Sequence, residues 1–236
     1  MPKVKELSIF FPFWNEQHNI EQVVAKASKI AKEVAENWEI LMIDDGSTDK
    51  TKEIAEKLAA ENKHLRVISH IPNRGYGAAL SEGFRNARYE LVVFNDGDAQ
   101  FDFSEISFFL EKIKNADIVI GYRKKRHDHP FRHVLMMLLK VWDLAFFHFY
   151  FRDIDCGFKL FKRTALESIG SLRSEGAMIS TEILAKAKAR GLKIEEVGVT
   201  HLPRKYGDQS GGNVFVIIRA MLESLLLYQD IKNKRF

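Results

Sequence analysis

Two carboxylates separated by one glycine, Asp96 and Asp98, are the sharpest chemical feature of the sequence. They follow a short apolar run, and Gln100 lies just beyond them. Two carboxylates at the end of one strand can reach the same hard cation, and the Gln100 side chain can add a carbonyl oxygen. The sequence therefore predicts a Mg²⁺ or Mn²⁺ site in which the metal also meets a substrate diphosphate. The structural alternative is an acidic turn whose carboxylates accept hydrogen bonds from backbone amides.

Polar clusters also follow three other strand-like runs, at residues 12–16, 44–51 and 73–78. Any one of them could be an ordinary turn or helix cap, because Asp, Asn, Gly and Ser dominate both. Ligands of α/β sheets, however, bind at the carboxyl ends of the strands. Four polar clusters that converge on one sheet edge therefore indicate a binding site.

The elements that must position these clusters alternate between strand-length apolar runs and helical patterns. The expected strands are residues 7–11, 39–43, 66–69, 91–94 and 117–120, and the expected helices include residues 20–34, 54–59 and 106–113. This alternation predicts an α/β fold with a mostly parallel central sheet flanked by helices. We expect residues 1–122 to form a nucleotide-binding half.

The second half of the chain has a different pattern. A basic run, 123–126, precedes residues 134–151, which are almost entirely apolar and rich in Phe. Helical periodicity places Lys140 and Asp143 on one stripe, opposite a wide aromatic and aliphatic face. A second amphipathic helix is predicted over residues 214–228, followed by a basic tail.

Two explanations remain open for the Phe-rich helix. A helix that is apolar nearly all round can be buried in the core or in a dimer interface. Basic flanks and many aromatic residues instead fit a helix that lies in the surface of an anionic membrane. We favour the interfacial helix, and the charges and length of the segment argue against a bilayer-spanning one.

Composition excludes several classes of protein. The chain has 236 residues, of which 46% are hydrophobic and 29% charged, and this excludes both disorder and a polytopic membrane protein. A single cysteine, Cys156, excludes a disulfide framework. The N-terminus lacks the apolar core of a signal peptide. A net charge of +4 does not indicate nucleic acid, and we expect no nucleic-acid partner.

The glycine pair Gly75 and Gly77 does not form a dinucleotide-binding fingerprint. The third glycine is missing, and the pair does not follow the first expected strand. The glycines instead fit the start of a helix, where the backbone N–H groups face an anion or where close packing requires glycine. No P-loop sequence occurs in the chain.

The motifs together resemble glycosyltransferase family 2 of the GT-A fold. The resemblance rests on Pro12-x-x-Asn15-Glu16, the Asp44-Asp-Gly-Ser-x-Asp-x-Thr run and Asp96-x-Asp98, whose order and spacing match over about the first 125 residues. Later segments are similar to the polyprenyl-phosphate branch, which contains the dolichyl-phosphate mannose and glucose synthases. These segments are Gly121-Tyr-Arg123, Asp155-Cys-Gly-Phe-Lys-Leu-Phe161, Glu182 and Arg204-x-Tyr-Gly207-x-x-Ser210.

The resemblance implies a division of the chain. Residues 1–210 would form the GT-A catalytic domain, with a nucleotide-sugar half at 1–122 and an acceptor half at 123–210 that includes the amphipathic helix 134–151. Residues 211–236 would form the C-terminal amphipathic helix and the basic tail. The sequence makes no prediction of the oligomeric state.

The resemblance also implies roles for individual residues. The substrate and nucleotide contacts would come from Pro12, Asn15, Glu16, Asp44, Asp45, Gly77, Asp96, Arg123, Arg204 and Ser210. The metal ligands would be Asp96, Asp98 and Gln100, and the catalytic residues Asp98, Arg123 and Glu182. The chain departs from the family pattern at Gly97, where alanine is more usual, and after Ser210, where many relatives carry lysine.

The implied reaction is a metal-dependent, inverting transfer of mannose or glucose, from GDP-mannose or UDP-glucose, to polyprenyl (dolichyl) phosphate. The protein would be cytoplasmic and peripherally bound to the cytoplasmic face of an anionic membrane. A lipid monophosphate is already anionic at neutral pH and needs no base. One alternative is a soluble family 2 enzyme that acts on a saccharide or protein hydroxyl with Glu182 as base. Another is a nucleotidyltransferase or a non-catalytic nucleotide-sugar binding module.

Overall fold

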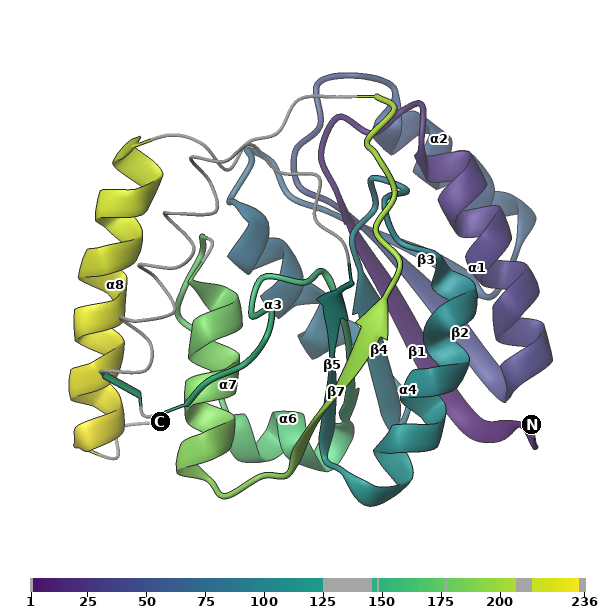
Figure 1. The fold of residues 1–236 in the computed structure, drawn as a ribbon. Coiled ribbons are helices and arrows are strands. Elements are labelled where there is room, and N and C mark those ends of the chain that lie inside the picture. Colours follow the sequence, from purple (N-terminus) through teal and green to yellow (C-terminus); the bar gives the residue numbers. More distant parts are fainter. Residues whose placement is uncertain (1, 125–145, 148, 177, 207–213, 234–236) are drawn as a thin grey trace.

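A seven-stranded sheet forms the middle layer of the computed structural model (Figure 1). The structure describes residues 2–124, 146–147, 149–176, 178–206 and 214–233, the last with side chains from 223 on. The strands are β1 (Val4–Phe13), β2 (Ala35–Asp44), β3 (Leu65–Ser69), β4 (Leu91–Asn95), β5 (Ile118–Arg123), β6 (Phe158–Lys162) and β7 (Ile194–Val199). Their order across the sheet is β3-β2-β1-β4-β6-β5-β7.

The strand directions confirm the predicted mostly parallel sheet. β1 pairs in parallel with both β2 and β4, and β3 continues the parallel set beside β2. β6 is antiparallel to its neighbours β4 and β5, and β7 is parallel to β5. All five predicted strands are present and run in one direction, with β6 inserted between the fourth and the fifth.

Helices cover both faces of the sheet (Figure 1). On one face lie α1 (Ile20–Val34), α2 (Thr51–Glu61) and α4 (Ile106–Lys112), which is flanked by the 3₁₀ turns η1 (Phe103–Glu105) and η2 (Ile113–Asn115). On the other lie α3 (Tyr76–Asn86), α6 (Arg163–Ile169), α7 (Ile179–Ala189) and α8 (Val214–Lys232). In β1, Ile9 and Phe11 pack toward α1, whereas Phe10 packs toward α3. This alternation of buried side chains explains why the strand is apolar at nearly every position.

The predicted Phe-rich helix 134–151 is wrong at its C-terminal end. Residues 134–145 lie outside the described part of the chain, and Phe146 and Phe147 are helical. Phe149 and Phe151 are not helical and are buried in the core on the α7 side of the sheet. Tyr150, between them, is exposed, so the two Phe rings are buried on the same side of this segment.

The C-terminal amphipathic helix is present as α8, which lies beside α7 (Figure 1). Its Leu227 is buried, whereas Leu225 and Leu226 are exposed. An ion pair of 2.7 Å between Arg173 and Asp230 fastens the helix to the loop before α7. In the part of the chain that the structure describes, we find no helix with the length and apolarity needed to cross a bilayer.

Candidate active site

The polar clusters after β1 and β2 are joined by hydrogen bonds. The Asn15 side chain accepts a hydrogen bond from Thr48 N at 2.8 Å, and Ser47 Oγ accepts one from Asn15 N at 3.0 Å. Glu16 N donates to Thr51 Oγ1, at the start of α2, at 2.8 Å. The backbone of Asn15 has a φ of 55°, in the left-handed region that Asn tolerates better than most residues. Asn15 therefore holds two loops together at the sheet edge, beside Pro12 at the end of β1.

Asp44 and Asp45 are both buried and both bind the protein itself. Asp44 Oδ1 accepts a hydrogen bond from Ser47 N at 3.2 Å. The Asp45 carboxylate accepts hydrogen bonds from Arg74 N at 2.9 Å and Gly75 N at 2.8 Å, and it lies 2.7 Å from His70 Nδ1. Asp45 thus shapes the loop that leads into α3, and its implied nucleotide contact stays a prediction.

The predicted metal pair follows β4. Asp96 N donates to Gly157 O at 2.9 Å, and Asp96 Oδ1 accepts a hydrogen bond of 2.8 Å from the Tyr76 hydroxyl. Asp98 accepts one from Gln100 N at 3.1 Å. Burial, and next the charge of Asp98, raises the pKa of Asp96 to about 6. The two carboxylates are therefore close enough to repel each other.

Arg204 links this pair to the cluster after β1. Its guanidinium lies 2.8 Å from Asp98 Oδ2 and 3.4 Å from Glu16 Oε1. Glu16 also accepts a hydrogen bond of 2.6 Å from Asn19. Burial raises the pKa of Glu16 from its usual value, although Asn19 and Arg204 lower it. Arg204, Glu16 and Asp98 are brought together as predicted.

Gln100 fixes the segment that carries Arg204. Its side-chain amide donates to Leu202 O at 3.0 Å, and Leu202 N donates to Gln100 O at 2.7 Å. Further along the same segment, the ring centroid of Tyr206 lies 5.1 Å from that of His18. Residues 201–206 therefore cross the ends of β4 and β1 as a strap, and the proposed metal contact of Gln100 stays a prediction.

The residues present fit a divalent cation held by two carboxylates. Among the described residues, no group of three or more His, Cys, Asp or Glu side chains is arranged to hold a metal. A methyl group added to Gly157 would overlap the Asp96 carboxylate, so glycine leaves that carboxylate its space. Mg²⁺ commonly binds one or two carboxylates together with substrate phosphates and water, and two carboxylates are what Asp96 and Asp98 supply.

Arg123 lies in a buried ion pair with Asp153. Its guanidinium donates to both carboxylate oxygens of Asp153, at 2.7 and 2.9 Å. The side chains of Arg123 and Asp153 are only 8% and 2% exposed. Although burial opposes the charge, the hydrogen bonds and charge of Asp153 raise the pKa of Arg123. For Arg123 to contact a phosphate, as predicted, its hydrogen bonds to Asp153 would have to break.

Glu182 and Gly77 contact a loop instead of an open site. Glu182 is buried in α7 and forms a 2.7 Å ion pair with Lys186. Gly77 N, which could have faced an anion, donates to Glu175 O at 2.8 Å. Gly77 is therefore in close contact with the loop before α7, and its implied nucleotide contact stays a prediction. Ser210 and Gly207 lie outside the described residues.

Three residues next to the predicted site could not be predicted from the sequence: Tyr76, Asp153 and Lys159. Tyr76 lies between Gly75 and Gly77, and burial of its hydroxyl, together with the Asp96 charge, raises the pKa of that hydroxyl well above the usual value. Lys159 is fully buried in β6, and burial lowers the pKa of its amino group. Its charge lowers the pKa of Asp96, so it counts among the groups that set the electrostatics of the site.

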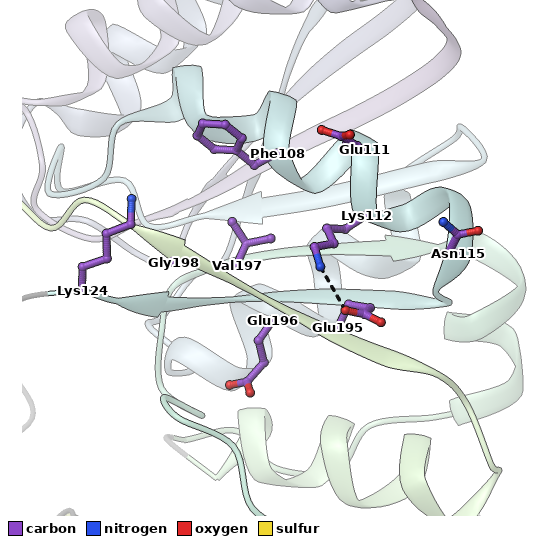
Figure 2. A pocket seen from close by; sticks show the side chains of 9 residues that line it. All are labelled: Phe108, Glu111, Lys112, Asn115, Lys124, Glu195, Glu196, Val197 and Gly198. Carbon is purple, nitrogen blue, oxygen red and sulfur yellow. Dashed lines mark hydrogen bonds and ion pairs between the residues drawn. The ribbon is translucent and has the colours of Figure 1, made fainter.

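A surface pocket of about 550 Å³ lies between α4 and β7 (Figure 2). Lys112 and Glu195 form an ion pair of 3.3 Å within it. The lining residues are Phe108, Glu111, Lys112, Asn115, Lys124, Glu195, Glu196, Val197 and Gly198. No predicted site residue is among them, so this pocket is distinct from the candidate active site.

Residues 8–170, which contain the carboxylate pair and the clusters after β1 and β2, match the sequence model described as Glycosyl transferase family 2. The chain belongs to glycosyl transferase family 2. Undecaprenyl-phosphate 4-deoxy-4-formamido-L-arabinose transferases of Salmonella choleraesuis (strain SC-B67) and Salmonella newport (strain SL254) are each 28% identical to this family 2 chain over 208 residues. The alignments cover 87% of the chain and 62% of these relatives, so the chain spans less than two thirds of their length.

Solved structures establish that this family 2 chain has the GT-A fold. Glucosyl-3-phosphoglycerate synthase from Mycobacterium tuberculosis, in complex with phosphoglyceric acid, superposes with a TM-score of 0.72 and 20% identity. The match covers 93% of the chain and 79% of that protein. The same enzyme in complex with Mg²⁺ and uridine diphosphate gives a TM-score of 0.69 at 17% identity, with the same coverage.

Proposed function

We propose that this protein is a metal-dependent glycosyltransferase that moves a sugar from a nucleotide-diphosphate sugar to a polyprenyl phosphate. The observation that carries the proposal is the pair Asp96 and Asp98 at the carboxyl end of β4, faced by Arg204. Membership of family 2 supports sugar transfer. The names of the Salmonella relatives support an undecaprenyl-phosphate type of acceptor.

The reaction is a direct displacement at C1 of the sugar, with inversion. An oxygen of the acceptor phosphate forms the new bond to C1, and the bond from C1 to the donor diphosphate breaks with its electron pair on the leaving nucleoside diphosphate. A bound divalent metal supplies charge neutralisation for this leaving group. Asp96 and Asp98 would hold that metal, and the Tyr76 hydroxyl would orient Asp96. Arg204, which lies beside Asp98, would contact the diphosphate oxygens of the donor.

The surroundings of Glu182 favour a phosphate acceptor over a hydroxyl. A hydroxyl acceptor needs a general base with a free carboxylate oxygen near the reacting atom. The Glu182 carboxylate is already engaged by Lys186 and by two backbone amides, of Arg173 and Ser174. A phosphate monoester, with its second pKa near 6, needs no such base. The soluble enzyme with Glu182 as base is therefore the weaker candidate.

The donor and the location belong to the same proposal. GDP-mannose and UDP-glucose remain the two candidate donors, and uridine diphosphate is bound in one of the two mycobacterial structures described above. We propose that the protein is cytoplasmic and lies at the cytoplasmic face of the membrane, where a polyprenyl phosphate would be presented. The exposed Leu225 and Leu226 on α8 support such a surface contact.

A transfer assay tests the proposal. The purified protein is incubated with Mn²⁺ or Mg²⁺, each candidate donor and a short polyprenyl phosphate, and the products are separated as glycolipids. We expect glycolipid with one donor, and none after chelation of the metal. Transfer only to an added saccharide would select the hydroxyl alternative, and no transfer from any donor would contradict the proposal.

A further inference from the structure

Glu182 anchors the loop of residues 171–176 that precedes α7. Its carboxylate accepts hydrogen bonds from Ser174 N at 2.8 Å and from Arg173 N at 3.0 Å. The Lys186 ammonium pairs with Glu182 at 2.7 Å and donates to Ser171 O at 2.5 Å. Glu182 and Lys186 are both at most 2% exposed. A buried charge of this kind holds its partners firmly, because leaving any of them unpaired is costly.

The anchored loop in turn supports the first turn of α3. Glu175 O accepts a hydrogen bond of 2.8 Å from Gly77 N. A Cβ added to Gly75 would lie 2.7 Å from the same carbonyl oxygen, and one added to Gly77 would overlap Ser174 O. The backbones of the loop and of α3 are therefore in direct contact, which only glycine permits at these two positions.

Tyr76 lies between these two glycines and reaches the metal pair. Its hydroxyl donates to Asp96 Oδ1 at 2.8 Å. On the opposite side, Asp45 holds the amides of Arg74 and Gly75. The turn that carries Tyr76 is thus fixed from both sides by buried carboxylates, Asp45 and, through its loop, Glu182.

We infer that Glu182 is a positioning residue, which acts through the loop 171–176 and Tyr76 to orient Asp96 for the metal. The inference deepens the proposed function and rests on it for the role of Asp96. It also replaces the base role with a different one: Glu182 exchanges no proton with the substrates. Glu182 and Asp96 are connected by a continuous series of hydrogen bonds and backbone contacts, each of which can be broken separately.

Mn²⁺ binding, measured calorimetrically on the protein without substrates, tests the inference. We expect Glu182→Gln to weaken Mn²⁺ binding by about 5- to 10-fold, because the loop loses its charged anchor. We expect Tyr76→Phe to weaken it by a similar factor. In the double variant the two losses should not multiply, because residues in one connected network are not additive. Multiplying losses would overturn the inference.

Glycine variants approach the same contact without touching Glu182. Gly77→Ala should reproduce the loss of Mn²⁺ affinity, because the methyl group would displace the loop from α3. Gly176→Ala is the matched control: a Cβ there meets no atom within 4 Å, and Mn²⁺ affinity should be unchanged. If Glu182→Gln fails to fold, Gly77→Ala still tests whether the contact between the loop and α3 affects Mn²⁺ binding. Wild-type Mn²⁺ affinity in Gly77→Ala would overturn the inference.

Transfer assays separate this inference from the proposed function. If Glu182 were a general base, Glu182→Gln and Glu182→Ala would lose transfer activity to the same extent, and their Mn²⁺ affinity would be unchanged. This result would overturn the positioning role alone. A positioning residue should keep more activity in Glu182→Gln than in Glu182→Ala, and added Mn²⁺ should restore part of it. If wild-type protein transfers no sugar while the Mn²⁺ results hold, the proposed function fails and the connection between Glu182 and Asp96 stands.

Discussion

Arg204 Nη2 lies 2.8 Å from Asp98 Oδ2, so the guanidinium pairs with a carboxylate oxygen that a bound metal would need. The same guanidinium reaches Glu16 at 3.4 Å. One cation thus neutralises carboxylates from two strand ends. A charged arginine beside a metal carboxylate competes with the metal for that carboxylate and can turn to phosphate oxygens once the substrate is bound.

We predict opposite effects of Arg204→Ala on metal binding and on transfer. Mn²⁺ affinity without substrate should rise several-fold, because a competing positive charge is gone. Transfer should fall by about 100-fold, in line with the loss of a charged contact to a leaving diphosphate. Calorimetry and the glycolipid assay measure the two quantities. Lys205→Ala, at the exposed neighbouring position, is the control, and weaker Mn²⁺ binding in Arg204→Ala would contradict the competition.

Asp98→Ala should strongly reduce metal-dependent transfer. We expect a fall of about 100- to 1,000-fold, because the metal would lose one of its two carboxylates. A Mn²⁺ titration of the transfer rate measures the effect. Asp102→Asn, whose carboxylate pairs with Lys26 at 2.8 Å, serves as the control that keeps its activity. Transfer with an unchanged Mn²⁺ dependence in Asp98→Ala would mean that the metal binds elsewhere.

The raised pKa of Asp96 predicts a pH-dependent loss of stability in metal-free protein. The unfolded chain ionises Asp96 near 3.8 and the folded chain near 6, so the folded state binds more protons between these values. Stability therefore falls as the pH rises through this interval, by roughly 2–3 kcal/mol, and the penalty is complete above about pH 6. The variant Asp96→Asn lacks this penalty. Its free energy of unfolding should equal that of the wild type near pH 4 and exceed it at pH 7, as measured by urea unfolding with a chelator present.

Asp102→Asn provides a control of opposite sign for that experiment. Burial opposes the charge of Asp102, but hydrogen bonds from Lys26 and Ser104 lower the pKa of its carboxyl. Its ionised form therefore stabilises the folded state at neutral pH, and this contribution is lost as the pH falls through the lowered pKa. Asp102→Asn should be less stable than the wild type at pH 7. The same trend in both variants would show that the pH effect does not come from Asp96.

The buried fork between Arg123 and Asp153 predicts a strong effect on folding. Arg123→Ala should lower the free energy of unfolding by about 3–5 kcal/mol, because it leaves a buried carboxylate without its partner. The double variant Arg123→Met, Asp153→Leu should recover most of that loss. Urea unfolding measures both. If the double variant is stable and still transfers sugar, Arg123 acts in folding; if it is stable and inactive, the predicted phosphate contact is supported.

The exposed leucines of α8 predict binding to anionic vesicles. Leu226→Glu should reduce the bound fraction, by about tenfold in partition coefficient, because it removes apolar area and adds a charge that the lipid repels. Flotation with vesicles that contain anionic lipid measures it. Phe108→Glu, at another exposed apolar position on the other face of the sheet, should bind as the wild type does. Failure of the wild type to float would contradict the membrane contact.

The alternation of strands and helices could be predicted from the sequence because burial on both faces of a sheet leaves a continuous apolar signature. β1 is an example, with Ile9 and Phe10 buried on opposite sides. β6 (Phe158–Lys162) and β7 (Ile194–Val199) are not among the predicted strands. In β6, Lys159 interrupts the apolar run, and its amino group donates to Cys156 O at 2.6 Å inside the fold. A short apolar run that contains a charged residue resembles a loop in the sequence, because the buried partner of the charge is visible only in the fold.

The convergence of Glu16 and Asp98 follows from the positions of their clusters after two strands, and the resemblance to family 2 adds Arg204, whereas the partners of single carboxylates could not be predicted. Asp45 and Glu182 have the residue type of a catalytic group, yet their hydrogen bonds go to loop amides. Those amides belong to backbone conformations that leave no pattern in the sequence. The residue type thus shows that a carboxylate is present, and only the fold shows which groups it contacts.

The antiparallel strand β6 has a consequence for a chain that emerges from the ribosome. β4 ends at Asn95, and its neighbour β6 begins at Phe158, about sixty residues later. Until those residues are made, β4 is an open sheet edge, the kind of surface that pairs with strands of other chains. Addition of β6 closes that edge and at the same time brings Gly157 against Asp96. The step that covers the open edge of β4 is therefore also the step that completes the candidate active site around Asp96.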